Sequence, residues 1–183
     1  MGVVSIAERN APSSNTEVAS PSTTSTNTPP ESEQEAASSV ANIKAVTDYN
    51  EVKDETHVGL PPIYLDKEFA VQAAYFVSGA TIKRPDEVYL HFAHLSDTRH
   101  WSEVNVVYFA QGNTRVHYDA STPKSGQRKS GGWESIDVWM PVDKFQQLVD
   151  GDRLLIQIGN DNLTVSGEHI KPFKEFSSEI PSS

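Results

Sequence analysis

Aromatic side chains are absent from the first forty-eight residues of this chain and frequent in the rest. The sixteen Phe, Tyr and Trp residues all lie at Tyr49 or beyond. Because aromatic side chains bury the largest apolar areas, a segment without them has little material for a hydrophobic core. The break divides the chain into an N-terminal part that cannot build a core and a C-terminal part that can.

The composition of the N-terminal part is typical of a spacer. Residues 11–30 contain five Ser, five Thr and four Pro, and residues 31–56 are acidic and rich in Ala. Such segments bury too little apolar surface to offset the entropy that folding removes. We therefore predict a disordered Ser/Thr/Pro-rich and then acidic spacer over residues 1–56, and a single β-rich globular domain over residues 57–180.

Negative charge is concentrated in the predicted spacer. Residues 1–56 carry three basic and nine acidic side chains, a net charge of −6, and residues 57–183 carry twelve basic and sixteen acidic ones, a net charge of −4. Binding to nucleic acid requires clustered Lys and Arg that neutralise phosphates. The sequence therefore argues against a nucleic-acid partner.

Short alternating runs bounded by turn residues predict β-strands after His57. The expected strands cover residues 69–77, 86–95, 103–110, 114–119 and 133–140, and Gln111-Gly112-Asn113 predicts a hairpin turn. Residues 120–132 are expected to form a polar loop. In three of these strands, alternate residues should share one face of the strand. They are Val88, Leu90 and Phe92 in the second strand, Val104, Val106 and Tyr108 in the third, and Ile136, Val138 and Met140 in the last.

The last fifty residues predict strand, helix, hairpin and helix. Pro141 suits the first turn of a helix whose apolar residues recur at helical spacing, and Asp150-Gly151 ends it. Ser166 is a candidate cap for a final helix that carries Pro172 near its start. Since no long crossover helices separate the strands, we predict a mainly β fold: an antiparallel β-sandwich or curved sheet of six to eight strands with two short C-terminal helices.

The C-terminal third resembles the ends of uncharacterised exported bacterial domains. The matching features are the strand at 133–140, the helix at 141–149, and the strand at 154–159 with its short return. This resemblance implies a β-rich domain and no catalytic motif or known activity. Together with the spacer composition, it favours a periplasmic or extracellular envelope location, with a cytoplasmic location as the alternative. Membrane association is expected only through a tether absent from this chain, because no apolar run approaches the ~20 residues that span a bilayer.

Histidines provide the first candidate site. His91 and His94 lie three apart in one predicted strand, with Asp97, His100 and Glu103 just beyond. Side chains alternate along a strand, so His91 and His94 should point to opposite faces. A metal site could instead combine His91 with His117 on a neighbouring strand. The alternative is that no metal is bound and that His91 is an ordinary exposed strand residue.

The segment 124–132 provides the second candidate. It gathers Lys124, Arg128 and Lys129 among Gly and Ser in an otherwise acidic chain. Such a loop can hold an anion through backbone amides and cationic side chains. It lacks the glycine spacing of a phosphate-binding loop, and a mobile solvated loop is the alternative interpretation.

Tryptophans on polar strand faces provide the third candidate. Exposed rings among Trp101, Trp133 and Trp139 would offer a surface for sugars, peptides or partner proteins. Trp139 stands out because its neighbours Val138 and Met140 place the core on the opposite face. The alternative is that a C-terminal helix covers it.

These observations predict a non-enzymatic β-rich binding or structural module presented on a spacer. No cofactor is expected, the partner is a protein or a carbohydrate, and the oligomeric state is left open. Two alternatives are a metal-dependent protein that uses His91 and His117, and an intracellular adaptor whose acidic tail folds on a partner. The chain contains no cysteine and none of the common hydrolase or dinucleotide motifs.

Overall fold

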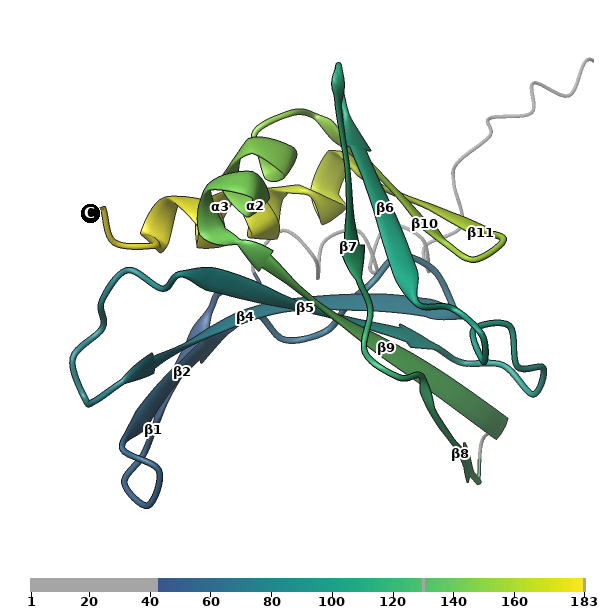
Figure 1. Ribbon diagram of the computed structural model, residues 1–183, viewed down its shortest axis with the longest axis horizontal. Helices are drawn as coiled ribbons and strands as arrows, with labels where there is room; N and C mark the ends of the chain where they lie inside the picture. The colour runs from purple at the N-terminus through teal and green to yellow at the C-terminus, as the bar shows by residue number, and fades with distance from the viewer. Residues whose placement is uncertain (1–42, 130, 183) are drawn as a thin grey trace, which may run out of the picture.

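The computed structural model describes residues 43–129 and 131–182, so the spacer predicted for residues 1–42 lies outside the described residues. The fold is mainly β, with two antiparallel sheets of seven and four strands and two C-terminal helices, and neither sheet closes into a barrel (Figure 1). The predicted fold class is confirmed. More strands are present than expected, because several short or exposed strands lack a clear alternating pattern.

The larger sheet forms the base of the molecule. Its strands are β1 (Val46–Asn50), β2 (Glu55–Gly59), β3 (Ile63–Tyr64), β4 (Phe69–Ser78), β5 (Glu87–His94), β8 (Lys124–Arg128) and β9 (Gly131–Pro141). Their order is β1-β2-β4-β5-β9-β8, and β3 pairs with β4. The sheet arches so that the strand pairs at its two ends, β1–β2 and β8–β9, slope away from the helices (Figure 1).

The smaller sheet consists of two hairpins. Its strands are β6 (Val106–Gln111), β7 (Thr114–Asp119), β10 (Arg153–Ile158) and β11 (Asp161–Ser166), in the order β11-β10-β6-β7. Gly112 and Gly159 lie in the two turns with φ of +54° and +58°, a backbone conformation that residues with a Cβ rarely adopt. The predicted hairpin at Gln111-Gly112-Asn113 is confirmed.

The core lies between the inner face of the larger sheet, the smaller sheet and the helices. Phe92, Ile136 and Val138 from the central strands have no exposed surface, and Phe109 of β6 reaches Phe92 with a ring separation of 6.2 Å. Alternate residues of β5 are buried, as the sequence pattern predicted. Each fully buried side chain of this size stabilises the fold by about 1.5–3 kcal/mol relative to an exposed one.

Two helices complete the layer above the larger sheet. Helix α2 (Val142–Val149) buries all four of its predicted apolar residues, and α3 (Lys171–Glu179) follows a 3-10 turn, η1 (Gly167–His169). Phe176 of α3 contacts Phe145 of α2 and Tyr75 of β4, with ring separations of 5.9 and 5.6 Å. Ser166 precedes the 3-10 turn without a side-chain capping hydrogen bond, so its predicted capping role is wrong.

The sheet begins earlier than the sequence pattern indicated. The expected boundary after residue 56 falls inside β2, and β1 adds a further edge strand before it. All five residues of β1 are exposed, so its burial pattern carries no alternation. Backbone pairing with β2, from Val46 with Gly59 to Asn50 with Glu55, places this segment in the sheet.

Two further local predictions are wrong. The segment expected to be a loop at 120–132 contains β8, which pairs with the start of β9. Strand β6 begins at Val106 instead of residue 103, and its buried residues are Val107 and Phe109. Tyr108 is 52% exposed because its face points away from the larger sheet.

Candidate functional site

The outer face of the larger sheet is the most distinctive surface of the described residues. Both helices and the smaller sheet lie on the other side of this sheet (Figure 1). Strand pairing aligns the outward residues of β4, β5 and β9 in rows, such as Gln72, His91 and Asp137. Because backbone groups in the centre of the sheet are used in the ladder, this face can recognise a ligand only through side chains.

Three aromatic rings form a continuous platform on this face, which we call the aromatic platform: Phe76, Tyr89 and Trp139. The ring of Trp139 lies 5.0 Å from that of Tyr89 and 5.9 Å from that of Phe76. Trp139 is 46% exposed and Phe76 is 37% exposed. The alternative prediction, that a helix covers Trp139, is wrong because both helices pack against the opposite face.

A hollow of about 420 Å³ adjoins the aromatic platform on the same face. Its lining combines small apolar residues with aromatic, polar and basic ones, the latter being Tyr64, Gln72, His91, Lys124, Arg128, Trp133 and Ser135. Tyr64 is 56% exposed, and the ring of His91 lies 6.2 Å from that of Tyr89. The aromatic platform and this open-face hollow therefore form one continuous surface.

Asp137 anchors the polar part of this surface. Its Oδ1 accepts hydrogen bonds from the Tyr89 hydroxyl at 2.7 Å and from His91 Nδ1 at 2.6 Å, and Lys124 Nζ lies 3.4 Å from Oδ2. The backbone amide of Asp137 donates to Ser121 Oγ at 2.9 Å. His91 and Asp137 are direct partners across β5 and β9, so the sheet register itself brings them together.

The electrostatics of this network keep Asp137 ionised. Burial alone would raise the pKa of this carboxyl, but hydrogen bonds from Tyr89 and His91 and the positive charge of His91 and Lys124 outweigh burial and lower it. The pKa of Tyr89 is raised, first by burial and then by its hydrogen bond to Asp137. The phenol therefore remains a donor that holds the carboxylate in place. Among the described residues, the side-chain partners of His91 are Tyr89 and Asp137, and no Ser or Thr hydroxyl is hydrogen-bonded to it.

The structure brings several sequence candidates together here. Lys124, Arg128 and Trp133 all line the open-face hollow, and the guanidinium carbon of Arg128 lies 5.6 Å from the centre of the Trp133 ring. Trp133 packs over Gly126, where an added Cβ would lie 2.7 Å from the indole nitrogen. Lys129 is exposed and does not line this hollow. The basic segment thus forms part of a strand edge beside an aromatic ring.

Trp101 does not belong to this surface. It has no exposed area, and its indole nitrogen donates to Asp161 Oδ2 at 2.8 Å. Trp101 is therefore not one of the exposed rings predicted among the three tryptophans, because its side chain is buried in the core.

The predicted pairing of His91 with His117 in a metal site is also wrong. His91 lies on the outer face of the larger sheet, whereas His117 belongs to β7 of the smaller sheet and stacks near Tyr108 with a ring separation of 5.6 Å. The prediction that His91 and His94 point to opposite faces is confirmed, since His91 is partly exposed and His94 is buried.

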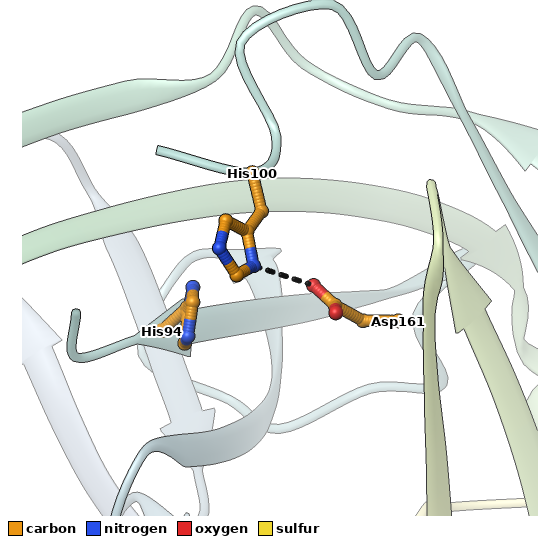
Figure 2. A group of neighbouring side chains, drawn as sticks. All are labelled: His94, His100 and Asp161. Atoms are coloured by element: carbon orange, nitrogen blue, oxygen red, sulfur yellow. Dashed lines mark ion pairs between the residues drawn. The ribbon is translucent and has the colours of Figure 1, made fainter. Parts of the chain in front are cut away.

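Buried His94 instead joins a second cluster at the end of β5. Figure 2 shows His94, His100 and Asp161, whose candidate ligand atoms all lie within 4.8 Å of one another. His100 comes from the loop after β5, and Asp161 is the first residue of β11. The cluster therefore joins the two sheets, and sequence analysis missed Asp161 because it lies 61 positions beyond His100.

Glu134 supports this cluster from β9. It is buried, its Oε1 lies 2.8 Å from His94 Nδ1, and it accepts backbone hydrogen bonds from His100 and Trp101. Burial alone would raise the pKa of Glu134, but the hydrogen bonds from His94 and the two backbone amides, with the charge of His94, lower it overall. An ionised Glu134 thus fixes both the imidazole and the loop that carries His100.

A larger hollow of about 540 Å³ lies on the outer face of the smaller sheet. Its lining includes Tyr108, Arg115, His117 and Arg153. Tyr108 is its one strongly exposed aromatic ring among the described residues, so it offers no ring platform. Size alone does not identify a binding site, and the grouping of rings favours the larger sheet.

Within residues 43–129 and 131–182, none of the helices has the length and apolar character needed to cross a membrane.

We expect Glu134→Gln to destabilise the fold by about 3–5 kcal/mol near pH 7, because it leaves buried donors without their carboxylate. The folded-state pKa of Glu134 lies below its ordinary value of 4.5, so its stabilising effect is present above pH 4.5 and is lost as the pH falls through the folded-state pKa. The difference in free energy of unfolding between the two proteins should therefore shrink below about pH 4.5. Urea unfolding from pH 3 to pH 8 measures this difference.

Glu87→Gln is the matched control, because Glu87 is exposed at the start of β5, at the opposite end of the strand from His94. It should change the free energy of unfolding by no more than about 0.5 kcal/mol. An equal loss in both variants would contradict the role assigned to Glu134.

No protein-family model, curated protein or solved structure matches this chain.

Proposed function

We propose that this protein is a non-enzymatic binding module that holds a carbohydrate chain on the outer face of its larger sheet. The observation that carries the proposal is the aromatic platform, in which partly exposed Phe76 and Trp139 are contiguous with Tyr89. Exposed rings of this kind are costly to leave in water and are typical of recognition surfaces. The open-face hollow beside them extends the surface.

The position of the platform supports a carbohydrate more than a peptide. Extended peptides commonly bind by adding a strand to a sheet edge through backbone hydrogen bonds. The platform instead lies over the central strands β4, β5 and β9, whose backbone groups already pair with one another. The electron-rich face of an aromatic ring attracts the C–H groups on one face of a sugar ring.

Polar side chains along the same face can bind the hydroxyl groups of such a chain. Gln72, His91 and Ser135 line the open-face hollow, and Lys124 and Arg128 stand at its edge. The two cations favour a saccharide that carries carboxylate or sulfate groups. Asp137 holds His91 and Tyr89 in place, so part of the surface is organised before a ligand arrives.

An oligosaccharide array that includes neutral, uronic-acid and sulfated chains identifies the ligand. For the chain that binds, Trp139→Ala should weaken affinity at least about tenfold in calorimetry, because truncating a central aromatic contact costs about 1.4 kcal/mol or more. Tyr108→Ala is the control, since Tyr108 is exposed to 52% on the other sheet. This variant should bind as the parent protein does.

Two outcomes would contradict the proposal. Equal saccharide affinity of the Trp139→Ala variant and the parent protein would exclude the aromatic platform as the binding site. If no saccharide binds and displayed peptides bind in a way that depends on Trp139, the outer face is still a binding surface, but its ligand is a peptide and not a carbohydrate.

The proposed setting is the bacterial cell envelope, with the Ser/Thr/Pro-rich segment as a spacer. The composition of residues 11–30 and the resemblance of the C-terminal third to exported bacterial domains support this setting. Fractionation of cells that express the native gene, followed by antibody detection, tests it. Signal in the envelope or the medium is expected, and signal confined to the cytosol would contradict it.

A further inference from the structure

We propose that His94, His100 and Asp161 bind a divalent transition-metal ion, with Zn²⁺ as the best fit. The three side chains converge at the junction of β5, the loop that follows it and β11 (Figure 2). Two imidazoles and one carboxylate form a donor set that suits Zn²⁺ and its neighbours in the first transition row. This site is independent of the outer face of the larger sheet, so either proposal can fail without the other.

The carboxylate of Glu134 orients His94 for this role. Since an ionised carboxylate can only accept, the 2.8 Å contact assigns a proton to His94 Nδ1 and leaves Nε2 as the nitrogen that can bind a metal. A carboxylate behind the imidazole is the usual support of a metal-binding histidine. The indole N–H of Trp101 donates a hydrogen bond to Asp161 Oδ2 at 2.8 Å and so orients this carboxylate.

The geometry requires only small movements of exposed groups. His100 Nδ1 already lies 3.7 Å from Asp161 Oδ2, and donors around a tetrahedral ion are separated by about 3.3 Å. The side chains of His100 and Asp161 are 43% and 21% exposed, so both can rotate, while His94 at 1% provides the fixed point. The ligand atoms of the widest pair are at most 4.8 Å apart, so an inward shift of about 1.5 Å brings them to this separation.

The charge around the cluster favours a cation. Glu68 Oε2 lies 3.9 Å from His94 Nε2 on the side away from Glu134. Three carboxylates, those of Glu68, Glu134 and Asp161, thus surround two imidazoles. Glu68 or a water molecule can complete a four-coordinate site.

A metal at this position would tie the two sheets together. His94 ends β5 of the larger sheet and Asp161 begins β11 of the smaller one. An ion bound only by the folded state stabilises it in proportion to the logarithm of the free ion concentration. Zn²⁺ should therefore raise the unfolding temperature in a concentration-dependent way.

The test uses the full chain without an affinity tag, treated with a chelator and then dialysed free of it. Titration with Co²⁺ should produce one equivalent of the visible absorption typical of a four-coordinate nitrogen and oxygen site, and Zn²⁺ should displace it. His100→Ala should weaken Zn²⁺ binding at least tenfold and reduce the rise in unfolding temperature at the same Zn²⁺ concentration. His117→Ala removes a histidine outside the cluster and should leave both unchanged.

Asp161→Asn is a second variant that tests the site. This variant keeps an acceptor for Trp101 but loses the ligand charge, so it should fold and bind Zn²⁺ more weakly. Near-ultraviolet circular dichroism confirms that each variant is folded. Absence of one-to-one binding to the parent protein, or unchanged affinity in a folded His100→Ala variant, would overturn the proposal and leave the cluster as a structural hydrogen-bond network.

Discussion

Burial of one face of the larger sheet is the constraint on which the rest of this structure depends. Alternate side chains of the central strands pack against the smaller sheet and the two helices, and Phe92, Ile136 and Val138 are fully enclosed. This burial supplies the main driving force for folding and fixes the pairing of β5 with β9, since a shift by one residue would turn these side chains outward. The opposite face of the sheet does not contribute to this core, so its side chains can be polar or partly exposed aromatic residues.

The same pairing explains why both histidine networks exist. His91 pairs with Asp137 and His94 pairs with Glu134 across the same two strands. Because the partners are three residues apart in each strand, the first pair lies on the outer face and the second faces the core. One register therefore positions a polar anchor for the aromatic platform and a carboxylate-supported imidazole at the junction of the sheets.

The sequence predicts those strands and helices in which burial of one face gives the apolar residues a regular spacing along the chain. The alternation in β5, the buried face of Ile136, Val138 and Met140 in β9, and the helical spacing of the apolar residues of α2 are confirmed. Strands β1 and β8 escaped prediction because their residues are mostly exposed, so burial imposes no alternating pattern on them. Exposure of Trp139 could be inferred from its strand neighbours. The contacts of Asp137 and Asp161 could not, because they depend on pairing between strands far apart in sequence.

The three indole groups offer the most direct measurement of the central claim that the outer face binds a ligand. Trp101 is fully buried, Trp133 lines the open-face hollow, and Trp139 is 46% exposed on the aromatic platform. Assigned indole N–H resonances can be followed by NMR during titration with the oligosaccharide chosen from the array. Binding on the outer face should shift the resonances of Trp139 and Trp133 and leave that of Trp101 in place. Saturable binding that leaves the Trp139 and Trp133 resonances in place would contradict it.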